Sequence, residues 1–273
     1  MITIVIPTIG RGKTFGRAFY SAIKWDNRLV SNIIVIDNSQ LTDFSNHLKD
    51  LIETTDDNRV SVITLPERAS MGKSWNSSLD LINTDWVLYL HDDDELIDVG
   101  PHIESIRDKL IENSNVGFIA FDFQCRFASA TFRKNKKVIY RWPELIDVNI
   151  LIDQCPKFVS TIINVAQLRK IQGFSDDYGY FLDFIAFLKI HRSASALTYP
   201  LVLGVYHLHE DNESDIRKRA AGYGNFIPQT CKTFYEICHV HELRHKFMKS
   251  VLGYSYMRRK GIFSRMVNAL CSI

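Results

Sequence analysis

The stretch DWVLYLHDDDEL (residues 85–96) runs from an apolar segment directly into Asp92, Asp93, Asp94 and Glu95. Its first half has the composition of a short buried strand. Carboxylates this close together oppose one another's ionisation, so solvent, a helix N-terminus or a metal ion must offset the repulsion. A helix N-terminus accounts for one or two of the carboxylates, whereas Mg²⁺ or Mn²⁺ held together with phosphate groups accounts for the whole cluster.

Apolar strands alternate with helical segments on both sides of this stretch. In chain order the pattern predicts strand 2–7, helix 14–25, strand 32–39, helix 41–55, strand 60–66, helix 69–83, strand 85–90, helix 102–114 and strand 116–123. This alternation predicts an α/β fold, a mainly parallel sheet with helices on both faces. Ligands bind beyond the carboxyl ends of such strands, so Asp37 and Asp92–Asp94 are expected to line one crevice.

The alternation ends after residue 123. Residues 124–150 are typical of hairpins or an insertion, 173–192 of a loop that enters a helix, and 196–210 of a strand. From residue 211 onward the sequence is helical and basic in character. We therefore expect one large domain with a C-terminal helical extension.

The composition excludes several classes of protein. With 273 residues, 46% of them hydrophobic, and a formal net charge of +2, the chain can bury a core and is not expected to bind nucleic acid. Its five cysteines form no C-x-x-C pair, which is typical of a reduced cytosolic protein. No signal peptide is expected, and no apolar run reaches transmembrane length, so any membrane contact is expected to be peripheral.

Two segments come close to the phosphate-binding pattern G-x-x-x-x-G-K-[ST], but each lacks the first glycine. Pro7 takes that position in PTIGRGKT (7–14), and Glu67 takes it in ERASMGKS (67–74). Proline has a fixed φ and no N–H, so it is a poor replacement in a loop that works through backbone donors. A phosphotransferase that uses Gly12-Lys13-Thr14 remains an alternative.

HELRH (241–245) matches the H-E-x-x-H pattern of zinc proteases. Catalytic zinc needs a third protein ligand, and no His, Asp or Glu follows His245. We therefore interpret the segment as a polar helix surface.

Five stretches, taken in order, resemble the family 2 glycosyltransferases of the GT-A fold. They are VIPTIGR (5–11), VIDNS (35–39), ERASMGKSWNSSLD (67–80), WVLYLHDDDE (86–95) and IQGFSDDYGYFLDF (171–184). The resemblance implies a Rossmann-like GT-A catalytic domain over 1–210, followed by a basic helical extension over 211–273. It further implies a nucleotide-sugar half over 1–123 and an acceptor half over 124–210.

The resemblance also assigns roles to individual residues. It implies that nucleotide-sugar binding involves Pro7, Thr8, Asp37, Gly72, Asn76, Asp92 and Asp93. It implies that the metal ligands come from Asp93, Asp94 and His209, and that the general base is Asp183.

Two departures from the family pattern affect these assignments. His91 stands where one alignment places the first Asp of the acidic motif, so the metal ligand is expected to be Asp93 or Asp94. Leu182 replaces the Glu that usually precedes the base. In its own sequence context, Asp183 is equally typical of a helix N-cap.

The implied reaction is an inverting, metal-dependent sugar transfer. A nucleotide-sugar, expected to be UDP-linked, lies across the strand ends, and Mg²⁺ or Mn²⁺ bridges its diphosphate to the acidic motif. Asp183 takes a proton from the attacking hydroxyl of a glycan or lipid-linked acceptor, as in bacterial surface polysaccharide synthesis. Because both motifs are irregular, a catalytically silent protein that binds sugar nucleotides is a further alternative.

The segment 243–273 contains seven Lys/Arg and no Asp or Glu, interleaved with apolar residues. It is expected either to pack on the catalytic domain as a helical cap or to lie on anionic lipid, near a lipid-linked acceptor. The second interpretation predicts a cytoplasmic protein that is peripheral to the inner face of the cell membrane.

Overall fold

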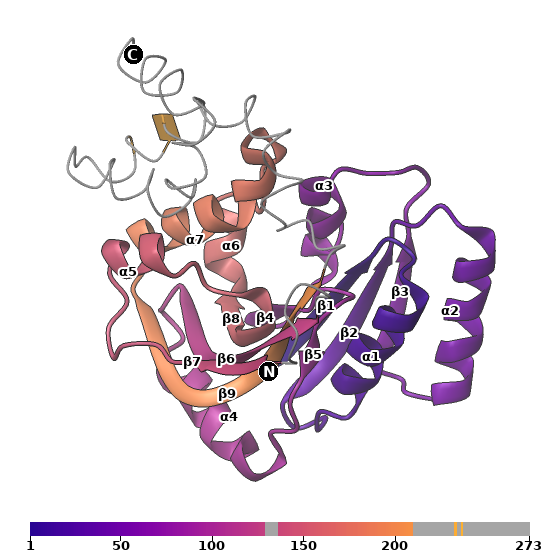
Figure 1. Ribbon diagram of the computed structural model, residues 1–273, viewed down its shortest axis with the longest axis horizontal. Helices are drawn as coiled ribbons and strands as arrows, with labels where there is room; N and C mark the ends of the chain where they lie inside the picture. Colours follow the sequence, from indigo (N-terminus) through magenta and orange to yellow (C-terminus); the bar gives the residue numbers. More distant parts are fainter. Residues whose placement is uncertain (129–135, 210–231, 234–235, 237–273) are drawn as a thin grey trace.

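The computed structural model describes residues 1–128, 136–209, 232, 233 and 236. Its strands pair into one nine-stranded sheet, and helices pack on both faces of that sheet (Figure 1). The predicted α/β class, with helices on both faces, is confirmed.

The N-terminal half alternates strands and helices. Its elements are β1 (Ile2–Thr8), α1 (Gly12–Ile23), β2 (Val30–Asp37), α2 (Thr42–Thr55), β3 (Val60–Thr64), α3 (Met71–Asn76), the 3₁₀ helix η1 (Leu79–Leu81) and β4 (Trp86–Tyr89). The strands pair in parallel in the order β3-β2-β1-β4. Their carboxyl ends therefore meet at one edge of the sheet, where ligands bind in such folds.

The helix predicted over 69–83 is shorter in the structure, because α3 ends at Asn76. The hydroxyls of Ser77 and Ser78 donate to the carbonyls three residues earlier, at 2.7 and 2.9 Å. Serine hydroxyls that bond to nearby carbonyls compete with the regular helical pattern, which continues here only as the short η1.

The C-terminal half extends the sheet with several antiparallel pairs. Its elements are β5 (Glu95–Leu96), the 3₁₀ helix η2 (Gly100–His102), α4 (Ile103–Glu112), β6 (Phe118–Ala128), β7 (Lys136–Tyr140), α5 (Val148–Asp153), the 3₁₀ helix η3 (Phe158–Ser160), β8 (Thr161–Asn164), α6 (Val165–Lys170), the 3₁₀ helix η4 (Asp176–Phe181), α7 (Leu182–Ser193) and β9 (Ala196–His209). β8 runs antiparallel to β4 and β6, whereas β6 and β9 are parallel. The full order is β3-β2-β1-β4-β8-β6-β9-β5, with β7 paired to β6.

Two hydrophobic cores lie on opposite faces of the sheet. Val5 of β1 belongs to the core beneath α3, α5, α6 and α7, whereas Ile4 and Ile6 belong to the core beneath α1, α2 and α4 (Figure 1). Successive side chains of a strand point to opposite faces, so a strand that serves both cores must be apolar throughout. Each fully buried Ile or Val stabilises the fold by about 1.5–3 kcal/mol, which makes the strand framework a firm support for the loops at its ends.

The predicted basic extension over 211–273, including HELRH (241–245), lies outside the described residues except at 232, 233 and 236. In the described part of the chain, no helix combines the length and the apolar character needed to cross a membrane.

Candidate active site

A cavity of about 310 Å³ lies at the carboxyl ends of β1 and β4. The predicted site residues that line it are Pro7, Thr8, Asp92, Asp93, Asp94 and Asp183. They come from the end of β1, the acidic turn after β4 and the first turn of α7. The fold therefore brings both halves of the chain to one cavity.

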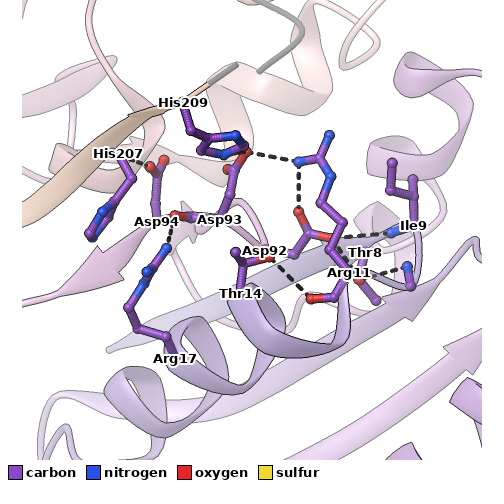
Figure 2. A network of polar contacts seen from close by, with 11 residues as sticks. Thr8, Ile9, Arg11, Thr14, Arg17, Asp92, Asp93, Asp94, His207 and His209 are labelled. Atoms are coloured by element: carbon purple, nitrogen blue, oxygen red, sulfur yellow. Dashed lines mark hydrogen bonds and ion pairs between the residues drawn. The ribbon is translucent and has the colours of Figure 1, made fainter. Parts of the chain in front are cut away.

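Asp92 is bonded to the loop that follows β1. Its Oδ2 accepts hydrogen bonds from the Thr8 hydroxyl (2.7 Å) and the Ile9 N–H (3.3 Å), and its Oδ1 lies 3.2 Å from Nη1 of Arg11 (Figure 2). Burial raises the pKa of Asp92, and the Arg11 charge and the Thr8 hydroxyl offset this only in part. Both oxygens of Asp92 thus fix the β1–α1 loop against the acidic turn.

Asp93 lies among positively polarised groups. Its Oδ2 is 2.8 Å from Nη1 of Arg11 and 3.1 Å from Nε2 of His209, and its carbonyl accepts a hydrogen bond from Arg17 (Figure 2). Burial acts to raise the pKa of Asp93, but the His209 hydrogen bond, with His91 and Arg11 nearby, outweighs burial and lowers it. Asp93 is therefore ionised at neutral pH.

Asp94 is the most deeply buried of the three aspartates, with 1% of its surface exposed. Its Oδ1 accepts a hydrogen bond from the His207 N–H of β9 at 2.9 Å. Burial and the adjacent charge of Asp93 raise the pKa of Asp94 well above its usual value. A bound cation would favour the ionised form of this carboxyl.

His91 forms a set of candidate cation ligands with Asp93 and Asp94. One ligand atom from each of these residues lies within 4.8 Å of the other two. Two ligand atoms of one ion can lie at most about 4–5 Å apart, because bonds to Mg²⁺, Zn²⁺ and Ca²⁺ are about 2.0–2.6 Å long. In addition, Nε2 of His91 is buried and has no hydrogen-bond partner among the described residues. These residues fit a divalent cation, while His209 lies outside the set and contacts it through Asp93.

Asp183 reaches the cavity from the first turn of α7. It is half-buried, and its Oδ1 accepts a hydrogen bond from the Phe184 N–H (2.7 Å). The N-cap position of α7 belongs to Phe181, so capping does not account for this carboxylate. A carboxylate in the first turn still interacts favourably with the helix dipole.

Asp37, one of the residues predicted to bind the nucleotide-sugar, does not line the cavity. It is 1% exposed, and its carboxylate accepts hydrogen bonds from the Ser39 N–H (2.9 Å) and the Ser45 hydroxyl. These bonds tie the end of β2 to the start of α2.

Gly72 and Asn76 of α3 also lie outside the cavity lining and instead hold the segment that leads to α7. The Gly72 N–H donates to Asp176 (2.7 Å), and the Asn76 amide exchanges hydrogen bonds with the backbone of Phe174 (2.7 and 2.9 Å). A Cβ on residue 72 would lie 2.8 Å from Oδ1 of Asp176, so glycine permits this close approach. Both residues therefore help to position the helix that carries Asp183.

Polar residues that were not expected from the sequence also line the cavity, among them Arg11, Asn38, Lys157 and Tyr206. Arg11 and Asn38 each follow a strand end closely, which is the signal that could have identified them. Lys157 and Tyr206 carry no such signal. The long-range pairing of β9 with β6 determines the position of Tyr206, and Nζ of Lys157 lies 5.5 Å from the centre of the Tyr206 ring.

Several solved structures share this architecture. TarS 1–349 from S. aureus has a TM-score of 0.65 at 12% identity, covering 93% of this chain and 72% of that one. The same fragment in complex with UDP-GlcNAc has a TM-score of 0.64 at 12% identity, covering 95% and 74%. Mannosyltransferase PcManGT from Pyrobaculum calidifontis, in complex with GDP-Man and Mn²⁺, has a TM-score of 0.61 at 13% identity, covering 100% and 80%. These likenesses confirm the predicted GT-A type of fold.

No curated protein matches the chain significantly in sequence. The family model described as Glycosyl transferase family 2, however, matches residues 3–157, which is more than half of the chain. The matched region contains the parallel strands β1 to β4 and the acidic turn. The chain therefore belongs to glycosyl transferase family 2, the family that its sequence resembles.

Proposed function

We propose that this enzyme transfers a sugar, with inversion and with a divalent cation, from a nucleotide-sugar to a hydroxyl of a glycan or lipid-linked acceptor. The observation that carries this proposal is that Asp183 and Asp92–Asp94 line the same cavity. A proton acceptor beside a diphosphate site is what such a transfer requires. The complexes of TarS with UDP-GlcNAc and of PcManGT with GDP-Man and Mn²⁺ support a nucleoside diphosphate sugar, and the TarS complex supports UDP.

The nucleotide-sugar would lie against Pro7 and Thr8, where positive side chains face its diphosphate. Arg11, Arg68 and Lys157 all line the cavity. Because Arg11 is paired with Asp92 and Asp93, a bound diphosphate would compete with the acidic turn for its guanidinium. In this proposal Asp37, Gly72 and Asn76 contribute to nucleotide-sugar binding indirectly, through the loops that they fix.

Asp93 and Asp94 would hold Mn²⁺ or Mg²⁺, with His209 supporting Asp93 through its hydrogen bond. A divalent cation held by these residues would neutralise the diphosphate and stabilise it as a leaving group. Asp92 keeps the acidic turn and the β1–α1 loop together, so the cation site and the strand end that faces the nucleotide stay in register.

Asp183 accepts the proton of the acceptor hydroxyl as the hydroxyl oxygen attacks the anomeric carbon. The bond from that carbon to the diphosphate oxygen breaks, and its electron pair leaves with the nucleoside diphosphate. Because the attacking oxygen enters from the face opposite to the leaving group, the linkage inverts and no covalent glycosyl-enzyme forms. Asp183 is half-buried and lines the cavity, so its carboxylate would be accessible to a hydroxyl bound there.

Asp183→Asn tests this role. An amide cannot take the proton, so turnover should fall by about 10²- to 10⁴-fold, while calorimetric binding of UDP with Mn²⁺ should match that of the wild type. A thermal-shift screen of nucleotide-sugars with Mn²⁺ selects the donor, and release of nucleoside diphosphate measures turnover. Asp177→Asn is the matched control, because Asp177 is exposed and precedes the same helix; it should turn over like the wild type.

Each alternative has its own outcome in these measurements. Equal turnover of Asp183→Asn and wild type would remove Asp183 as the base. A wild type that binds UDP with Mn²⁺ but releases no nucleotide from any donor would be a catalytically silent binding protein. Binding of ATP instead of UDP would favour the phosphotransferase that uses Gly12-Lys13-Thr14, and no shift with any nucleotide-sugar would contradict the whole assignment.

The acceptor side of the proposal rests on composition. The segment 243–273 carries seven Lys/Arg without any Asp or Glu. Such a segment is attracted to anionic lipid, so we place the enzyme at the inner face of the cell membrane, as a peripheral protein near a lipid-linked acceptor.

A further inference from the structure

His91 has a buried ring nitrogen that the fold does not use. Its Nε2 is shielded from solvent and has no hydrogen-bond partner among the described residues. The ring is flanked by Trp75 and Phe158, with centroids 5.2 and 5.3 Å away. These aromatic neighbours hold the ring in place but form no hydrogen bond with its Nε2, and a buried polar atom without a partner is unfavourable.

The acidic turn brings this ring next to two carboxylates. The Asp94 N–H donates to the His91 carbonyl at 3.1 Å, which closes a tight turn over residues 91–94. A ring nitrogen of His91 and carboxylate oxygens of Asp93 and Asp94 then lie within 4.8 Å of one another. Asp92 faces elsewhere, since both of its oxygens are bonded to the β1–α1 loop.

The geometry points to His91 as a nitrogen ligand of the cation, in the position where one alignment places the first aspartate of the family motif. This inference deepens the proposed function and rests on the cation site that the proposed function requires. His91, Asp93 and Asp94 are then the protein ligands, and Asp92 is a positioning residue for the loop.

A nitrogen ligand changes which cation the site prefers. Mg²⁺ is bound almost entirely by oxygen, whereas an imidazole strengthens binding of divalent transition metals, in the order Mn²⁺, Co²⁺, Ni²⁺. A family site with oxygen ligands alone would discriminate less between Mn²⁺ and Mg²⁺. We therefore expect this enzyme to select Mn²⁺ over Mg²⁺ and to bind Co²⁺ still more tightly than Mn²⁺.

His209 is the other imidazole beside the site, and the test must separate the two. Its Nε2 lies 3.1 Å from Oδ2 of Asp93, the oxygen that also contacts Arg11. A nitrogen signal from the bound ion could therefore arise from either histidine, so both are varied.

The test is pulsed electron paramagnetic resonance of Mn²⁺ bound to the full chain with UDP. Directly ligated imidazole nitrogen modulates the spin echo, and this readout does not depend on turnover. We expect the modulation in wild type and in His209→Gln, and its loss in His91→Asp, which restores an oxygen ligand. His91→Phe keeps a ring between Trp75 and Phe158 but supplies no ligand, so its Mn²⁺ affinity should fall by at least about 10-fold, the loss that removing even an outer-shell partner causes.

Calorimetry with Mn²⁺ and Mg²⁺ gives a second measure of the same ligand. The ratio of Mn²⁺ to Mg²⁺ affinity should fall by about tenfold or more in His91→Asp and should be unchanged in His209→Gln. Mn²⁺ binding without nitrogen modulation, or modulation that survives in His91→Asp and disappears in His209→Gln, would overturn the assignment of His91 alone. A wild type that binds no Mn²⁺ with UDP would instead overturn the cation site of the proposed function, and His91 with it.

Discussion

At the scale of single residues, Asp94 carries the clearest conflict between stability and function. Burial and the charge of Asp93 raise the pKa of Asp94 well above its usual value. A carboxyl whose pKa is raised on folding contributes stability at acidic pH, and this contribution is lost as the pH rises through the folded pKa. At neutral pH without metal, the Asp94 carboxyl therefore weakens the fold.

Asp94→Asn should consequently stabilise the metal-free enzyme. The amide keeps an oxygen for the His207 N–H and removes the buried charge. In EDTA at neutral pH we expect the Tm to rise by about 2–4 °C, the shift that about 1 kcal/mol produces in a chain of this size.

In the wild type, Mn²⁺ should raise the Tm, because the ion favours the Asp94 anion, and the variant should lose this response. Asp122→Asn, at a buried aspartate outside the turn, is the control and should show no gain in EDTA; a lower Tm for Asp94→Asn in EDTA would contradict the argument.

The sequence predicted the residue types of the site better than their orientations. Parallel strands end at one edge, so the sequence predicts Asp37 and Asp92–Asp94 in one crevice, and Asp92–Asp94 do line the cavity. The same reasoning could not foresee that Asp37 turns toward Ser39 and Ser45, away from the cavity. Which way a side chain turns at a strand end depends on loop contacts, and sequence periodicity carries no information about them.

At the scale of elements, the contact between α3 and the segment before α7 determines where Asp183 lies. Gly173 has a φ of +72°, and a Cβ at this position would lie 2.3 Å from Oδ1 of Asn76 and 2.7 Å from Cδ1 of Leu79. A side chain there would strain the backbone and push Asn76 away from Phe174. The Asn76 amide bonds both the carbonyl and the N–H of Phe174.

Gly173→Ala should therefore reduce both stability and turnover. We expect a loss of about 1–3 kcal/mol in the free energy of unfolding, measured by urea denaturation. Turnover should fall in the folded fraction, because α7 shifts with the segment that precedes it. Gly16→Ala is the matched control: a Cβ at that position in α1 meets nothing within 4 Å, and alanine should stabilise the helix by about 0.5–1 kcal/mol. Full turnover in a destabilised Gly173→Ala would show that the contact between α3 and the segment before α7 does not position Asp183.

Element prediction succeeded where the pattern is local and stopped where pairing is long-range. Apolar runs and helical spacing predict the parallel strands and their helices. Most of these elements lie within residues 3–157, the region that the family model matches. A strand over 196–210 was predicted, but its place between β6 and β5 was not. That pairing brings His207 and His209 to the acidic turn and Tyr206 to the cavity, and no local signal in YHLHE determines it.

At the scale of the whole molecule, the site draws on both layers of helices. Arg11 and Arg17 come from the region of α1, which packs on one core, whereas Asp183 comes from α7, which packs on the other. The sheet between them fixes the acidic turn through β4. The candidate cation set of His91, Asp93 and Asp94 lies between these layers, so it would need little rearrangement to bind an ion, which is the condition for tight and selective binding.

The remaining whole-molecule question is whether residues 243–273 attach the enzyme to a membrane. Each Lys or Arg near an anionic surface contributes about 1 kcal/mol, so replacing Arg258, Arg259 and Lys260 with Ser should weaken vesicle binding by about 100-fold. The measurement is co-sedimentation of the full chain with phosphatidylglycerol vesicles, and binding should also fall as salt is raised, because salt screens exposed charge.

The matched control replaces the exposed residues Lys24, Lys49 and Lys170 with Ser; it makes the same change in net charge and should bind like the wild type. An equal loss of vesicle binding in both triple variants would mean that net charge, and not the segment 243–273, determines the binding. Unchanged binding after truncation at residue 242 would assign the segment to packing on the catalytic domain instead of to lipid.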